Sequence, residues 1–261
     1  MDLEIADHGA VVTGASRGIG RAIALRLAGE GVRLLLVARS AEGLAEVAQA
    51  CGGAAATLAL DVTAAGAAEQ VAEAARDQIG QVDILINNAG VSTDRPLDTL
   101  TPEDYQAQWE IHVLAPLRLM QTFAPGMAER GWGRIVNVAS IAGRRPTPTN
   151  VSYSVAKAAE LMLTRAFADH YAANGVCVNA VNPGPVENEM WTTPGGMADQ
   201  VAARRGITRE EVLVELGTST PRRQSATSDE IAAAVAFLCS PLAANVVGAG
   251  WQNDGGLVPF I

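Results

Sequence analysis

The chain has 261 residues and a formal net charge of −9, and 49% of its residues are hydrophobic while only 4% are aromatic. This length and composition are typical of a single globular α/β domain, which we expect to span residues 1–261. The acidic balance argues against nucleic acid or an anionic membrane as a partner. No apolar run approaches the ~18 residues that a membrane span needs.

The start of the chain, Met1-Asp2-Leu3-Glu4, is acidic and does not resemble a signal peptide. Three widely separated cysteines match neither a disulfide framework nor a metal cluster. We therefore expect a cytoplasmic protein without a metal site.

Short apolar runs alternate with longer, Ala-rich amphipathic stretches. Continuously apolar strands are typical of a sheet that is buried on both faces. Their alternation with helices predicts βαβ units and a doubly wound parallel sheet of the Rossmann type. The predicted strands are residues 9–13, 33–38, 56–60, 82–86, 134–139, 176–181 and 246–250, and the predicted helices between them include 20–29, 41–50 and 64–78.

Two longer stretches, 100–130 and 152–174, are predicted to be helical. A third, residues 188–223, lacks strand patterning and contains predicted helices at 197–205 and 209–217. Thr208 followed by Glu211 is a capping-box pattern that opens the second of these helices. A helical insertion beyond a strand end is typical of a lid over a substrate site.

A glycine-rich turn follows the first predicted strand, with the spacing G-x-x-x-G-x-G. Glycines allow the backbone to turn tightly and to approach a pyrophosphate, while the next helix offers free N–H groups. Such turns are common, but the position directly after the first strand favours a dinucleotide site over a plain turn. The candidate residues are Gly14, Ser16, Arg17, Gly18, Ile19 and Gly20.

The second predicted strand ends in Ala38-Arg39-Ser40. An acidic residue at this point would bind the ribose hydroxyls of NAD. Here Ala38 takes that place, and two guanidiniums, Arg39 and Arg17, suit the 2′-phosphate of NADP(H) by charge and geometry. The alternative is that both arginines are solvated surface residues.

Further motifs follow the strands in order. They are Asp61-Val62, Asn87-Asn88-Ala89-Gly90, Ser140, Tyr153-Ser154-Val155-Ala156-Lys157, Pro183-Gly184 and Asn253-Asp254-Gly255-Gly256. Each is weak alone, but together they resemble, over essentially the whole chain, the classical short-chain dehydrogenase/reductase family, including its 3-oxoacyl carrier-protein reductases.

The resemblance implies a homo-oligomer, and specifically a tetramer. It also implies the positions of the remaining contacts to the cofactor. These are Asp61, Val62, Asn88, Ala89, Gly90, Tyr153, Lys157, Pro183, Gly184 and Val186.

Tyr153 and Lys157 are four residues apart and therefore share one face of a helix. An ammonium beside a phenol favours the phenolate and lowers the phenol's pKa from its reference value of about 10. Tyr153 is thus expected to be the acid/base of hydride transfer between a nicotinamide and a carbonyl or alcohol carbon. Ser140 is expected to bind the carbonyl oxygen. Outside the full motif set, such a Tyr–Lys pair is most often a helix surface pair.

Two residues depart from the family pattern. His112 stands where the family usually has an Asn that helps to hold a relay water. A histidine can both donate and accept a hydrogen bond, and its titration near neutrality would add pH dependence; the alternative is a buried structural His. Asn188 stands near the place of a Thr that contacts the carboxamide, and its own side chain can also bond to an amide.

The substrate is less well specified. Apolar residues of the insertion and of the loop after Ser140 suit a medium-sized hydrophobic substrate, or else they are ordinary packing. They are Met190, Trp191, Met197, Ile141, Pro146 and Pro148. Gly131 and Asn174 stand where carrier-protein reductases present basic residues, and with the net charge of −9 this argues against an acidic carrier.

The sequence therefore predicts an NADP(H)-dependent oxidoreductase that acts on a small carbonyl or alcohol substrate. The alternative is a non-catalytic NADP(H)-binding sensor of the same fold, which only the change at His112 supports. An epimerase or dehydratase that uses transient oxidation usually has a longer chain.

Overall fold

The computed structural model describes residues 1–53, 55–147 and 149–259, so that Pro148 of the predicted substrate loop lies outside the described residues. Seven parallel strands form one sheet in the order β3-β2-β1-β4-β5-β6-β7. The strand order reverses between β1 and β4, which confirms the predicted doubly wound, Rossmann-type sheet. The strands are β1 (Gly9–Thr13), β2 (Arg33–Ala38), β3 (Ala56–Ala59), β4 (Ile84–Asn87), β5 (Gly133–Val138), β6 (Val176–Pro183) and β7 (Gly250–Asn253).

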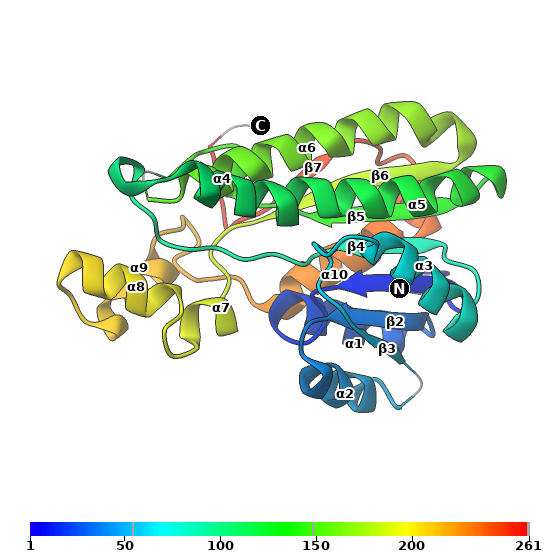
Figure 1. Cartoon of the computed structure of the whole chain (residues 1–261), viewed down its shortest axis with the longest axis horizontal. Coiled ribbons are helices and arrows are strands. Elements are labelled where there is room, and N and C mark those ends of the chain that lie inside the picture. The colour runs from blue at the N-terminus through cyan, green and yellow to red at the C-terminus, as the bar shows by residue number, and fades with distance from the viewer. Residues whose placement is uncertain (54, 148, 260–261) are drawn as a thin grey trace.

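Helices cover both faces of the sheet (Figure 1). One face carries α1 (Gly18–Gly29), α2 (Ala41–Ala50) and α10 (Ser228–Cys239), and the other carries α3 (Ala67–Gln78), α5 (Ala115–Glu129) and α6 (Val151–Tyr171). Successive strand residues alternate between the two cores: Val12 packs under α1, and Val11 packs on the opposite face. Burial on both faces explains why the strands are continuously apolar.

The predicted helix over 100–130 is interrupted. Its parts are α4 (Pro102–Trp109), the π-helical turn η2 (Glu110–Leu114) and α5. In η2 the N–H of Ala115 donates to the carbonyl of Glu110, five residues earlier. Pro116, which follows, has no N–H to donate and its ring obstructs regular α-helix, so the chain widens into a π turn. This turn carries His112.

The seventh strand begins later than predicted, at Gly250 rather than at residue 246. The segment before it is held against β6 in part by the side chain of Asn179. Its Nδ2 donates to the carbonyl of Val246 at 2.6 Å, and its Oδ1 accepts from the N–H of Ala249 at 2.9 Å. Two backbone bonds, from the N–H of Gly248 to the carbonyl of Val178 and from the N–H of Ala180 to the carbonyl of Ala249, join the same segment to β6, and the regular strand begins at Gly250. The fourth strand also begins later than predicted, at Ile84.

The insertion 188–223 is helical, as predicted, and contains α7 (Glu189–Thr192), α8 (Met197–Arg205) and α9 (Arg209–Thr218). The capping box of Thr208 and Glu211 is present. Figure 1 shows these helices set apart from those that cover the sheet, and α8 and α9 share a small core of their own. None of the helices in the described ranges is long and apolar enough to cross a membrane.

Short 3-10 turns connect several of these elements. They are η1 (Leu97–Thr99), η3 (Ile141–Gly143), η4 (Ala172–Asn174) and η5 (Pro241–Ala243).

Candidate active site

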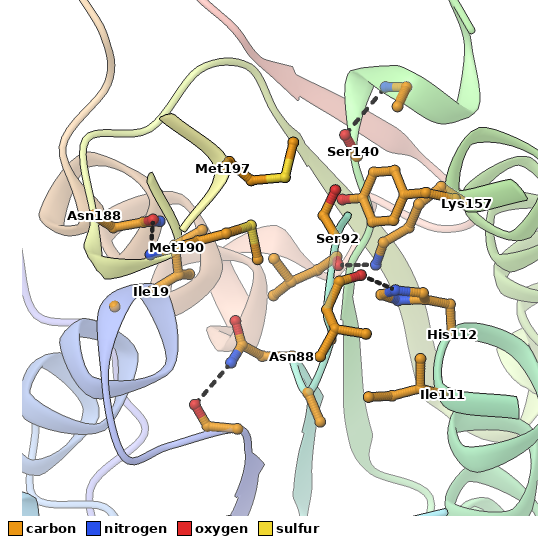
Figure 2. A pocket seen from close by; sticks show the side chains of 18 of the residues that line it. Ile19, Asn88, Ser92, Ile111, His112, Ser140, Lys157, Asn188, Met190 and Met197 are labelled. Atoms are coloured by element: carbon orange, nitrogen blue, oxygen red, sulfur yellow. Dashed lines mark hydrogen bonds between the residues drawn. The ribbon is translucent and has the colours of Figure 1, made fainter. Parts of the chain in front are cut away.

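A cavity of about 1220 Å³ lies at the carboxyl ends of the strands. All of the predicted catalytic and cofactor-contacting residues line it, from Gly14 in the glycine loop to Val186 after β6. Ser140, His112 and Lys157 enter from one side, and Met190 and Met197 of the helical insertion lie opposite (Figure 2). The fold thus brings together motifs that are spread over most of the chain.

Backbone conformation or close packing requires glycine at three positions of the glycine loop. Gly14 and Gly18 have positive φ angles of 65° and 55°. A Cβ on Gly14 would lie 2.8 Å from the Cα of Ala89, and one on Gly20 would lie 2.2 Å from the carbonyl oxygen of Gly14. Helix α1 has no side-chain cap at its N-terminus, and its first residues line the cavity. Its free N–H groups and positive dipole end suit a pyrophosphate.

The NNAG turn holds the glycine loop in place. The Nδ2 of Asn88 donates to the carbonyls of Thr13 and Gly14, at 3.0 and 3.2 Å. The hydroxyl of Thr13 accepts from the N–H groups of Asn88 and Ala89, at 3.0 and 3.1 Å. These bonds tie the ends of β1 and β4 together across the reversal of strand order. Asn88 therefore supports the loop through contacts that its position in the sequence does not reveal.

Polar groups gather where β2 and β3 end. The carboxylate of Asp61 accepts from the hydroxyl and the N–H of Thr63, at 2.7 and 2.9 Å, and these bonds lower its pKa, with a further contribution from Arg39. Arg39 and Arg17 are exposed and line the cavity, whereas Ala38 is buried. With the glycine loop, these residues fit a nicotinamide dinucleotide.

Ser40 and Asn188 each act as a helix cap. Ser40 accepts from the N–H of Gly43 at 3.1 Å at the start of α2, and Asn188 accepts from the N–H of Met190 at 3.0 Å at the start of α7. Both also line the cavity. The cap occupies the carbonyl oxygen of Asn188 and leaves its amide N–H groups for a ligand.

Lys157 is buried with an exposure of 4%. Its Nζ donates to the carbonyl of Val138 at 2.8 Å and to the carboxylate of Glu160 at 2.7 Å, and it lies 5.7 Å from the centre of the Tyr153 ring. Ser140 follows β5 and accepts from the N–H of Ala142 at 3.1 Å. Its hydroxyl hydrogen remains available to a ligand.

His112 is buried against Tyr153. Its Nε2 lies 2.9 Å from the carbonyl of Val91, to which it must donate, and its Nδ1 is buried without a partner. Burial, together with the charge of Lys157, holds the pKa of His112 well below its ordinary value of 6.5. The expectation of titration near neutrality is therefore corrected, because a protonated imidazole would be buried beside an ammonium.

Gly90 leaves the space that this imidazole needs. A Cβ on Gly90 would lie 2.6 Å from the Cε1 of His112. Gly90, the last residue of the NNAG turn, and His112 are thus packed against each other.

Sequence reasoning missed two features of the site. Asn150 donates to the hydroxyl of Ser92 at 2.6 Å, and both residues line the cavity. No local pattern links them, since they lie far apart in the chain. Glu160 was also missed, although its place three residues after Lys157 is a helical i, i+3 spacing.

Comparisons with known proteins agree with this geometry. The model of the short chain dehydrogenase family matches residues 8–196. The chain is 35% identical to a 3-oxoacyl-(acyl-carrier-protein) reductase of Vibrio cholerae, over 95% of this chain and 96% of that protein. It is 33% identical to a sorbitol dehydrogenase of Cereibacter sphaeroides, over the same shares of the two chains.

A similar solved structure is L-sorbose reductase from Gluconobacter frateurii, complexed with NADPH and L-sorbose, with a TM-score of 0.92, 33% identity and complete coverage of both chains. Levodione reductase gives a TM-score of 0.90 at 29% identity and covers 97% of this chain and 98% of its own. With its motifs, its sheet and its cavity in agreement, this chain belongs to the short-chain dehydrogenase family and is an oxidoreductase.

Proposed function

We propose that the protein reduces a small ketone or aldehyde to an alcohol with NADPH, and catalyses the reverse reaction with NADP⁺. The observation that carries this proposal is the meeting of Ser140, Tyr153, Lys157 and His112 in one cavity with the glycine loop. We also propose that residues 1–261 form the single domain that supplies these four side chains.

NADPH, held by the glycine loop and by the residues at the ends of β2 and β3, would supply the hydride for the carbonyl carbon. The hydroxyl of Tyr153 donates a proton to the carbonyl oxygen, and the hydroxyl of Ser140 donates a hydrogen bond to the same oxygen. The ammonium of Lys157 favours the phenolate that remains on Tyr153. The neutral Nδ1 of His112 accepts a hydrogen bond from a water that returns the proton.

The preference for NADP(H) rests on Arg17 and Arg39. Both guanidiniums line the end of the cavity where β2 stops, and no carboxylate replaces Ala38 to bind ribose hydroxyls. A doubly charged 2′-phosphate would gain charge-assisted hydrogen bonds there. The NADPH in the similar L-sorbose reductase supports the same choice.

The substrate that we propose is free rather than attached to an acidic carrier protein. Gly131 and Asn174 carry no positive charge, and the net charge of −9 would repel an acidic partner. Helices α7 to α9 would act as the lid, because Met190 and Met197 face the catalytic side chains across the cavity (Figure 2).

We also propose a homotetramer in the cytoplasm. Large apolar side chains are exposed on α4 and α6 and at the edge strand β7, among them Trp109, Met162 and Trp251. Such exposed side chains suit subunit contacts. The buried thiols of Cys177 and Cys239 suit a reducing compartment.

The test is an assay of the purified protein with a panel of ketones and alcohols and with both cofactors. We expect NADPH oxidation that depends on a ketone, and a loss of kcat of ~10²-fold or more in Tyr153→Phe. NADPH affinity, measured by fluorescence titration, should be retained in that variant. Near-normal kcat in Tyr153→Phe would contradict the role of Tyr153 as acid/base. NADPH binding without turnover of any ketone would favour the alternative, a non-catalytic NADP(H)-binding sensor.

A further inference from the structure

One face of α6 carries a row of polar side chains beneath the active site, and all of them but Tyr153 are buried. Tyr153, Lys157, Glu160 and Thr164 follow helical spacings of four, three and four residues. Glu160 is 1% exposed and Lys157 is 4% exposed. The carboxylate and the ammonium are in contact, with 2.7 Å between Oε2 and Nζ.

A buried carboxylate at this position needs a reason other than stability. Removing an ion pair from water costs several kcal/mol per ion, and an apolar pair of similar size is often as stable. Lys157 belongs to the proposed catalytic group, so an apolar pair is not an option there. Glu160 does not line the cavity, so it can act on the reaction only through its contact with Lys157 and through its charge.

The hydrogen bonds of Lys157 show how Glu160 would act on the active site. An ammonium has three donors. One bonds to the carbonyl of Val138 on β5 and one to Glu160, which leaves one for the cavity that Lys157 lines. The carboxylate therefore fixes the direction of the side chain and also offsets its charge.

We propose that Glu160 is a positioning residue of the active site, which holds the Lys157 ammonium and offsets its charge so that Tyr153 keeps its proton at neutral pH. This inference rests on the proposed role of Tyr153 as acid/base. Tyr153 would then enter the reaction as an acid, and the pair would favour reduction of the carbonyl over oxidation of the alcohol.

Other charged groups around Lys157 do not duplicate this effect. His112 on η2 has a lowered pKa and is neutral at neutral pH. Glu110, also on η2, is paired with Arg118, and Glu103 on α4 lines the open cavity. Arg134 on β5 donates to the carbonyls of Gly133 and Ser240, and β6 has no charged residue. Within the described residues, Glu160 is the carboxylate bonded to Lys157.

Burial and the ion pair act on Glu160 in opposite directions. The pKa of Glu160 is raised above its ordinary value, because burial outweighs the charge and the hydrogen bond of Lys157, which lower it. Seven residues of helix separate Tyr153 from Glu160 by about 10 Å along the axis. At an effective dielectric constant of about 20, one charge at that distance moves the ionisation of a phenol by about one pH unit.

The test measures tyrosine ionisation directly, by ultraviolet absorbance during a pH titration of the cofactor-free protein. The chain has three tyrosines, and subtracting the titration of Tyr153→Phe isolates the signal of Tyr153. We expect its midpoint to fall by about one pH unit in Glu160→Gln, which keeps the size and an acceptor but removes the charge. Glu160→Asp, which keeps the charge, should titrate like the wild type.

Asp169→Asn is the matched control, because Asp169 is also a carboxylate on α6 that pairs with a base, Arg165, but it is exposed and more than two turns further along. Its midpoint should equal that of the wild type. An unchanged midpoint in Glu160→Gln, or an equal fall in Asp169→Asn, overturns the proposal.

Circular dichroism should show first that each variant is folded, since a lone buried ammonium is destabilising. If Glu160→Gln does not fold, the wild-type midpoint decides, because a midpoint at or below neutrality means that Tyr153 is already ionised and overturns the proposal. Normal turnover in Tyr153→Phe defeats the proposed function whatever the titration gives. Lost turnover there with an unmoved midpoint in Glu160→Gln defeats this inference alone.

Discussion

The imidazole of His112 meets the ring of Tyr153 edge-on, with 5.1 Å between the ring centroids and an angle of 85° between the planes. The Nε2 of His112 donates to the carbonyl of Val91, so its Nδ1 is left to accept a hydrogen bond from water. We expect His112→Asn to keep or raise kcat, because it restores the residue usual in the family. His112→Ala should lower kcat, because it leaves a gap and an unpaired water.

The measurement is the pH dependence of kcat for the wild type and the two variants. Since the pKa of His112 lies well below 6.5, any extra loss of rate from its protonation should fall on the acid side of that value and vanish in His112→Asn. Indistinguishable profiles for the three proteins would make His112 a packing residue, and any proton path would run elsewhere.

The same buried imidazole should make the fold sensitive to acid. The pKa of His112 is lowered in the folded state, so below about pH 6.5 the unfolded chain binds a proton that the folded chain does not. Stability is therefore full above this pH and is lost as the pH falls toward the folded-state pKa. His112→Asn should lose less free energy of unfolding between about pH 7.5 and pH 5.5, measured by urea denaturation.

His170→Asn, at an exposed position on α6, is the control for this stability measurement. It should show the acid sensitivity of the wild type. A wild type and a His112→Asn variant that lose equal free energy over this interval would contradict the prediction.

Cofactor choice should depend on the arginines at the ends of β1 and β2. Removing a charge-assisted hydrogen bond costs about 1.5–3 kcal/mol, which is roughly a 10- to 150-fold change in an equilibrium. Ala38→Asp combined with Arg39→Ala should therefore swing the ratio of kcat/KM values from NADPH toward NADH. Arg76→Ala, at an exposed site on α3, should leave the ratio unchanged. Equal kcat/KM for both cofactors in the native protein would refute the preference.

The helical insertion is fastened to the body of the protein at Asp94. The N–H of Asp94 donates to the side chain of Gln200 at 3.0 Å, and its carboxylate, 3% exposed, pairs with Arg204 on α8. Arg204→Ala should raise the KM for the ketone about fivefold, since a partly exposed ion pair contributes about 1 kcal/mol. It should also speed amide hydrogen exchange across α8.

Arg205→Ala offers a matched control for the insertion, because the neighbouring Arg205 pairs with Glu215 inside the insertion. If both variants raise KM equally, the link to Asp94 has no special role in closing the site.

Assembly should bury the apolar side chains exposed on α4, α6 and β7. Light scattering at micromolar concentration should give four times the 27.0 kDa of one chain. Met162→Glu, at a position on α6 that is 69% exposed, should reduce that mass. Val214→Glu, at a similarly exposed position on α9, should not. A wild-type mass of one chain would rule out the oligomer.

The sequence by itself determined the fold class and most of the elements that build the cavity. Strands β1 and β2 match their predicted bounds, because apolar runs between turn residues are a local signal that burial on both faces requires. The glycine loop and the Tyr153–Lys157 pair also follow local rules, one of backbone sterics and one of helical spacing.

The tertiary structure decided what depends on partners distant in the chain. The side chain of Asn179 binds the segment before β7, and the fold buries His112 and thereby lowers its pKa. Glu160 shares a helical spacing with Lys157, but the burial of this ion pair depends on the sheet beneath α6, which takes both charges out of water. Desolvation and long-range hydrogen bonding act only once the chain has closed around these groups, and no local pattern records them.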